Sequence, residues 1–429
     1  MRTDGLRLQD APPLAIPLSF FLTAPLAAMI AGAVLVASGA AAVTTTWAPV
    51  TLGLTHLGTL GFLSMVMMGA LYQMLAVVAG SPVPWQRSAH AVHALFVTGA
   101  AALTWGISQG VTQAVFVAIA TLGLAFLLFV LPVATALLRA PARDDTVIGM
   151  GAALLCLLLT VAAGTWMAHG HGGMHFPGPR DLWIRVHLCV ALLGWVGGLI
   201  IAVSWQVLPM FYLAREVPRP AKRIVQLLTT GGALLPVVVL GVDAFGLVDD
   251  AQRPLVGAAA VAALPAVLSV WFLHPAASAW SLRGRRRKRS DASLWFWRTG
   301  LLMAPLTGVA AVAAYLLPGE RWGLLFGWLA IWGWAGTIVH GMLTRIVPFL
   351  VWLHRFAPVV GEVPVPSVRA LLPDGRARVG LVLHAGSVLL GAGGILSGSD
   401  LLVRAAGLAL LATAGWLLGL LLGVIRRRP

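Results

Sequence analysis

Apolar runs long enough to cross a lipid bilayer recur along nearly the whole sequence, and they limit the fold more than any other feature. One of them, THLGTLGFLSMVMMGALYQMLAVVAG at 55–80, contains no Asp, Glu, Lys or Arg. Crossing the hydrocarbon core takes about 20 apolar residues in a helix, and only helices and closed barrels satisfy their backbone there. With 59% hydrophobic and 10% charged residues, the composition is that of a membrane protein rather than a soluble one.

The pattern predicts an all-α integral membrane protein with twelve transmembrane helices. No connection between the runs is long enough to fold as a soluble domain, so residues 1–429 are expected to form a single polytopic membrane domain. The predicted spans are about 15–38, 50–79, 88–107, 111–138, 146–168, 183–213, 224–247, 254–277, 295–317, 321–352, 377–396 and 401–425.

The basic residues fall mainly in alternate connections, and they give the chain a formal net charge of +15. The densest groups are RGRRRKR at 283–289 and RRR at 426–428. Because basic connections stay on the cytoplasmic side, both termini are expected on that side of a bacterial inner (plasma) membrane. Anionic lipid then accounts for the basic excess, and no nucleic-acid partner is expected.

A short motif recurs every four predicted spans. Spans 2, 6 and 10 end in YQMLAVVAG, WQVLPMFYL and TRIVPFLVW, where Gln73, Gln206 and Arg345 each stand three residues before Ala or Pro. A repeat at this period predicts three pseudo-threefold four-helix units, at about 1–138, 146–277 and 295–425. Gln73 is expected to hydrogen-bond backbone groups that are freed at a helix end.

Histidines are the main titratable groups inside the predicted spans, since every Asp and Glu lies in a connection or at a span end. His56 precedes Gln73 by 17 residues and His187 precedes Gln206 by 19, a rise of roughly 26–29 Å at ~1.5 Å per residue. Both histidines are therefore expected near the outer face. Haem iron in a helical bundle is usually held by histidines on facing helices, so the pair predicts a haem b site.

Three further residues complete the predicted cofactor-binding set. His340 lies deeper in span 10, and His384 lies early in span 11. Arg345 is the only basic residue well inside a span, and its guanidinium suits a haem propionate or another anion. The alternatives are an arginine that extends to the cytoplasmic face and histidines that bond carbonyls in the core.

A Gly-rich segment, HGHGGMH at 169–175, forms a separate candidate metal site. His169, His171 and His175 stand beside methionines, and imidazole with thioether in a Gly-rich segment predicts a copper or zinc site on the outer side. The alternative is a polar loop whose histidines meet the membrane interface.

Twelve spans in three four-helix units, with histidines on spans 2, 6 and 10, resemble subunit I of the haem–copper oxidases and nitric oxide reductases, and the related NnrS-like membrane proteins. The resemblance implies that His56 binds a low-spin haem and that His187 binds copper. Span 7, IVQLLTTGGALLPVVVLGVDAFG, lacks the adjacent histidine pair that completes the oxidase copper site. The chain is therefore most similar to a non-oxidase member, for which electron transfer in respiration or nitric oxide handling is the expected task.

With that task a redox partner such as a cytochrome is expected. No catalytic residue is assigned, and the residues leave open whether the chain is an enzyme. Two other functions remain. One is a twelve-helix solute transporter whose path is lined by the same histidines and Arg345, although the lack of acids inside the spans disfavours it. The other is a copper-handling membrane protein built on His169, His171 and His175.

Overall fold

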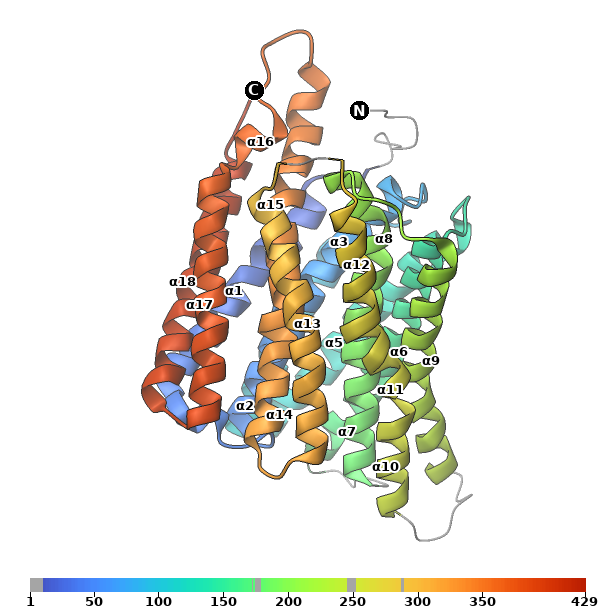
Figure 1. Ribbon diagram of the computed structural model, residues 1–429, viewed down its shortest axis with the longest axis vertical. Helices are drawn as coiled ribbons and strands as arrows, with labels where there is room; N and C mark the ends of the chain where they lie inside the picture. Colours follow the sequence, from blue (N-terminus) through green and yellow to red (C-terminus); the bar gives the residue numbers. More distant parts are fainter. Residues whose placement is uncertain (1–10, 172, 174–178, 245–251, 287–288) are drawn as a thin grey trace. The chain divides into compact units, whose positions relative to one another are not determined.

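The computed structural model describes residues 11–171, 173, 179–244, 252–286 and 289–429, and most of them are helical (Figure 1). Within this described part, one isolated bridge between Val360 and Val363 is the only extended pairing. Twelve of the described helices are long and apolar enough to cross a membrane, which confirms the predicted fold class. Their bounds are Ala15–Val43, Pro49–Val77, Ser88–Gln109, Thr112–Arg139, Asp145–His171, Arg180–Tyr212, Arg219–Val242, Leu255–Arg283, Ala292–Leu316, Arg321–Val359, Asp374–Ser397 and Asp400–Ile425.

The chain divides into two compact units. Unit 1 consists of Met1–Ala11 and Met74–Arg287, and unit 2 consists of Pro12–Gln73 and Lys288–Pro429. These bounds do not coincide with the three predicted four-helix units, so the pseudo-threefold grouping stays a prediction.

Unit 1 is built around a series of helices that pack on their neighbours in sequence. α4 turns back into α5 at Gly110, whose φ of 68° is a left-handed value that glycine adopts without strain. α5 packs on α6, and α6 packs on α8. The helices are α4 (Ser88–Gln109), α5 (Thr112–Arg139), α6 (Asp145–His171), α7 (Arg180–Leu188), α8 (Gly198–Tyr212), α9 (Arg219–Ala244), α10 (Gln252–Ala262), α11 (Leu264–Leu268) and α12 (His274–Arg283).

Unit 2 joins the two ends of the chain, because α18 packs beside both α1 and α17 (Figure 1). α1 and α18 come so close that a Cβ atom on Gly32 would lie 2.7 Å from the carbonyl oxygen of Gly407. Small residues at such crossings let two helix backbones touch within a membrane. The helices are α1 (Ala15–Ser38), α2 (Pro49–His56), α3 (Met65–Val77, which continues into unit 1), α13 (Ala292–Leu316), α14 (Arg321–Trp328), α15 (Thr337–Val351), α16 (Val368–Leu371), α17 (Asp374–Ser397) and α18 (Asp400–Ile425).

Spans 2, 6 and 10 share an α–π–α arrangement that the sequence motif did not predict. Their π-helical segments are η3 (Leu57–Ser64), η4 (Cys189–Gly197) and η6 (Leu329–Gly336). All three end nine residues before the motif residue of their span, which is Gln73, Gln206 or Arg345. The motif therefore marks equivalent positions in three helices that share the α–π–α arrangement. Shorter irregular segments are the π-helical Ser269–Leu273 and Trp352–Phe356 and the 3₁₀-helical Gly39–Val43 and Ala357–Val359.

Candidate functional site

The predicted residues His340 and His384 meet inside unit 2. Their rings are arranged edge to face, with centroids 5.2 Å apart and an interplanar angle of 84°. Both residues are buried, with 2% of their surface exposed. Phe296 of α13 closes the pair on one side, with its ring centroid 4.6 Å from that of His340. Residues 44 positions apart in the sequence thus form one buried imidazole pair.

His384 is tied to the π-helical segment of span 10. Its Nε2 atom lies 2.9 Å from the carbonyl oxygen of Trp332 and 3.0 Å from Oγ1 of Thr337. Because a carbonyl oxygen can only accept, Nε2 of His384 carries the proton and donates it. Thr337 also donates to the carbonyl oxygens of Gly333, at 2.6 Å, and Trp332, at 3.2 Å. The two side chains together bind backbone oxygens that a π segment offers outside the regular α-helical ladder.

His340 differs from its neighbour because its Nε2 atom has no hydrogen-bond partner within the described structure. This atom faces α17 at Gly380, where a Cβ atom would lie 3.4 Å from it. A buried polar atom without a partner is costly, and in native structures it often marks a place where a ligand, a proton or a water acts. Of the two ring Nε2 atoms of the pair, only that of His340 lacks a partner in the described structure.

His56 is the last residue of α2 and stands directly before η3. Its Nδ1 atom donates to the carbonyl oxygen of Leu52 at 2.8 Å. That bond places the proton on Nδ1 and the lone pair on Nε2, which is the tautomer of a histidine that binds metal through Nε2. The glycines that follow His56 let a neighbouring helix pack closely, since a Cβ atom on Gly58 would lie 2.6 Å from a methyl carbon of Ile331.

His187 belongs to unit 1, in the last turn of α7 and just before η4. It packs against α6, where a Cβ atom on Gly164 would lie 3.1 Å from its Cε1 atom. His56 belongs to unit 2, so the structure describes the two predicted haem ligands within separate units.

His169 and His171 lie in the last turn of α6 and not in a loop as expected, and each has a local partner. Nδ1 of His169 bonds the carbonyl oxygen of Thr165 at 2.8 Å, and Nε2 of His171 accepts from Nη2 of Arg180 at 3.4 Å. His175 lies outside the described residues. Among the residues that are described, no group of three or more His, Cys, Asp or Glu is placed to hold a metal ion. The copper site at His169, His171 and His175 stays a prediction.

A third buried histidine, His274, is the first residue of α12 in unit 1. It is 0% exposed, and its Nε2 atom lies 2.9 Å from Oγ of Ser204 and 3.1 Å from Oγ of Ser278. Its Nδ1 atom has no hydrogen-bond partner in the described structure. The i, i+4 spacing of His274 and Ser278 was the sequence signal available for this contact.

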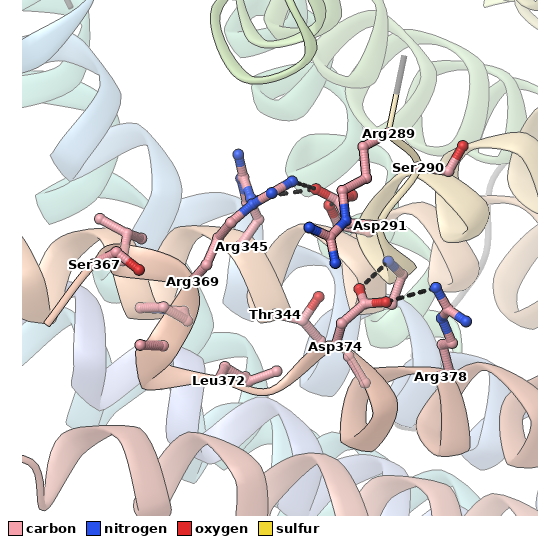
Figure 2. Close-up of a pocket in the computed structure, with 16 residues that line it drawn as sticks. Arg289, Ser290, Asp291, Thr344, Arg345, Ser367, Arg369, Leu372, Asp374 and Arg378 are labelled. Atoms are coloured by element: carbon pink, nitrogen blue, oxygen red, sulfur yellow. Dashed lines mark hydrogen bonds and ion pairs between the residues drawn. The ribbon is translucent and has the colours of Figure 1, made fainter. Parts of the chain in front are cut away.

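Arg345 of α15 lines a cavity of about 370 Å³ that also borders the first residues of α13 and α17 (Figure 2). Its Nη1 atom lies 3.5 Å from Oδ2 of Asp291, and Nη2 of Arg369 lies 3.3 Å from the same oxygen. Asp291 also begins α13, where its Oδ1 atom accepts from the backbone N–H of Leu294 at 3.1 Å. Asp291 was not among the predicted site residues, although an aspartate directly before an apolar run is a helix N-cap signature.

The buried pair does not fit a haem held between two histidines. Such a haem needs its macrocycle between the two imidazoles, whereas the rings of His340 and His384 touch each other and Phe296 packs against the first. His56 has the tautomer that a metal-bound histidine also has, and so do His169 and His354, whose Nδ1 atoms likewise bond the carbonyl oxygen four residues earlier.

No family model matches the chain, and no curated protein is significantly similar to it. The fold and the arrangement of its polar groups define the class, which is a twelve-helix membrane protein.

Proposed function

We propose that the chain is a haem b-binding protein of a bacterial inner membrane, with His56 as an axial ligand and a role in respiratory electron transfer or nitric oxide handling. The observation that carries the proposal is the position of the histidines on the repeated α–π–α spans. His56 directly precedes η3, and His187 stands two residues before η4. The resemblance to non-oxidase relatives of the haem–copper oxidases, with cytoplasmic termini and a cytochrome as redox partner, belongs to the same proposal.

The local chemistry of His56 supports this role. π-helical segments inside α-helices are frequent at functional sites, because the widened turn moves side chains out of the regular register. The Nδ1–Leu52 bond fixes the ring and its tautomer, as the outer partner of a metal-bound histidine does. The corresponding residue before η6 is Trp328, whose Nε1–H donates to the carbonyl oxygen of Val388 at 2.9 Å. Span 10 therefore contributes no histidine at this level.

Bound haem would supply one-electron redox chemistry and an iron that takes small diatomic ligands. The chain contributes the ligand, its orientation and an apolar surrounding. Leu57 and Phe62 are buried residues of η3, and the ring of Phe62 lies 5.6 Å from that of Trp332. Aromatic and aliphatic walls of this kind exclude water from a porphyrin edge.

The test is the visible spectrum of the purified protein, oxidised and reduced with dithionite, in the wild type and in His56→Ala and His187→Ala. His354→Ala is the matched control, since Nδ1 of His354 also bonds the carbonyl oxygen four residues earlier, that of Leu350, at 3.0 Å. We expect a Soret band and sharp reduced bands that His56→Ala loses and His354→Ala keeps. A colourless wild-type protein without iron, or bands that His56→Ala leaves unchanged, would contradict the proposal.

A second candidate function is solute transport. It is favoured by a column of buried polar side chains that continues from the arginine-lined cavity along α15. Thr344 lines the cavity, His340 stands one turn further along α15, and Thr337 and His384 follow. Uptake of a labelled anion into proteoliposomes by a colourless protein, abolished in His340→Ala, would support transport over haem binding.

A further inference from the structure

We propose that the cavity beside Arg345 is a binding site for a phosphate group, carried either by a lipid headgroup or by a soluble phosphate compound. The cavity has a volume of about 370 Å³ and lies within unit 2. Four arginines line it, namely Arg289, Arg345, Arg369 and Arg378 (Figure 2). The proposal is independent of haem binding at His56.

The charge of the cavity favours an anion. The described lining contains four arginines and two acids, Asp291 and Asp374. Asp291 pairs with Arg345 and Arg369, and Asp374 pairs with Arg378 at 2.8 Å. No hydrogen bond or ion pair joins Arg289 to another residue of the described lining (Figure 2). The cavity thus has an excess of positive charge that a doubly negative phosphate would neutralise.

The guanidinium groups are held in place before any ligand arrives. Oδ2 of Asp291 binds both Arg345 and Arg369, while its Oδ1 atom accepts from Leu294 N and from Oγ of Ser293. Asp291 is therefore fixed by hydrogen bonds at the start of α13, and it holds two arginines from later in the chain. Holding the side chains in advance reduces the entropy that binding would otherwise cost.

A second acid at the cavity, Asp374, is also held in place. Asp374 begins α17, and its Oδ1 atom accepts from the backbone N–H of Ala292 at 2.6 Å while its Oδ2 atom binds Arg378. The contact ties the N-terminus of α17 to that of α13, a helix of 25 residues. Both helices direct the positive ends of their dipoles to this side of the cavity.

Phosphate suits this arrangement better than a carboxylate does. Arginine forks bind phosphate oxygens in pairs, and a tetrahedral group can face several guanidiniums at once. Ser367 adds a hydroxyl at the cavity wall (Figure 2). The cavity also lies beside the first residues of two spans, Ala292–Leu316 and Asp374–Ser397, and the ends of membrane spans are where lipid phosphates occur.

The test uses the full chain in detergent with two probes. Inorganic pyrophosphate is titrated by calorimetry, and retention of phosphatidylglycerol against phosphatidylcholine is measured by native mass spectrometry. Arg289→Gln is the first variant, because Arg289 is exposed and removing it breaks no contact with the described lining. Arg376→Gln is the matched control, since Arg376 is exposed on the first turn of α17 but is not among the lining residues.

We expect saturable binding that Arg289→Gln weakens about tenfold, the loss of one charge-assisted hydrogen bond, and that Arg376→Gln leaves unchanged. Arg289→Gln combined with Arg369→Gln should abolish it. Pyrophosphate binding identifies a soluble phosphate compound as the ligand, and selective retention of phosphatidylglycerol without it identifies a lipid headgroup. Absence of saturable binding by both probes, or equal weakening in Arg289→Gln and Arg376→Gln, would overturn the proposal.

Discussion

Nε2 of His384 lies 2.9 Å from the carbonyl oxygen of Trp332, so that a side chain of α17 binds the backbone of the π-helical segment in span 10. The contact links two helices through a group that an unbroken α-helix would use internally. The contact also explains how this imidazole can be buried, because its Nε2–H already has a hydrogen-bond acceptor.

Substituting His384 tests this link. His384→Leu removes the 2.9 Å side-chain bond to the Trp332 carbonyl and keeps the longer bond from Thr337, at 3.2 Å, so we expect a loss of about 1–3 kcal/mol in the free energy of unfolding. His384→Gln keeps an N–H donor and should recover part of that loss. Thermal unfolding in detergent measures both variants. Equal stability of His384→Leu and the wild type would show that the bond contributes little.

Substituting Gln73 should leave the stability unchanged or raise it, whereas substituting His384 should lower it. The prediction that it bonds freed backbone was wrong, since neither Nε2 nor Oε1 of this buried amide has a partner in the described structure. Replacing an unsatisfied buried polar group by an apolar one of similar shape removes a desolvation cost. We therefore expect Gln73→Met to melt at the wild-type temperature or above it. A clear fall in melting temperature would mean that the amide binds something the chain itself does not supply.

The crossing of α1 and α18 is sensitive to a single methyl group. A Cβ atom on Gly407 would lie 2.7 Å from the carbonyl oxygen of Gly32, so Gly407→Ala forces two backbones apart and should cost about 1–3 kcal/mol. Gly419→Ala, on the same helix, meets no atom within 4 Å and should be neutral or slightly stabilising because alanine favours helix. Thermal unfolding of the two variants side by side measures the difference. Similar effects would contradict the close crossing.

We expect the stability of unit 2 to depend on pH through Glu320, which lies in a loop of that unit. Its Oε2 atom accepts from Thr45 Oγ1, Thr46 N and Thr46 Oγ1, each at 2.9 Å. Hydrogen bonds from the backbone and hydroxyl of Thr46, and then from Thr45, lower the pKa of this carboxyl below its ordinary value of 4.5.

A lowered pKa in the folded state means that the ionised carboxylate stabilises the fold. This stabilisation is fully present above the ordinary value of 4.5 and is lost as the pH falls through the lower pKa of the folded state. Melting temperatures of the wild type and Glu320→Gln should therefore differ at neutral pH and converge in acid. A constant difference across that range would contradict the role of the carboxylate.

The sequence alone determined the spans, because the bilayer imposes one length and one polarity on every crossing helix. The predicted span at 88–107 is observed as Ser88–Gln109, and that at 401–425 as Asp400–Ile425. The motif at Gln73, Gln206 and Arg345 likewise marked equivalent positions in three helices.

Only the tertiary structure decided how the polar groups pair. The carbonyl oxygen of Trp332, in the π-helical segment η6, finds its side-chain partner in His384, 52 residues away. Arg345 was predicted as an anion ligand, but its partner Asp291 lies 54 residues earlier and reaches it through the packing of α13 on α15. Hydropathy specifies where a helix crosses the membrane, whereas the rotation and neighbours of that helix, which choose the partner of each buried polar group, follow from side-chain packing across the whole unit.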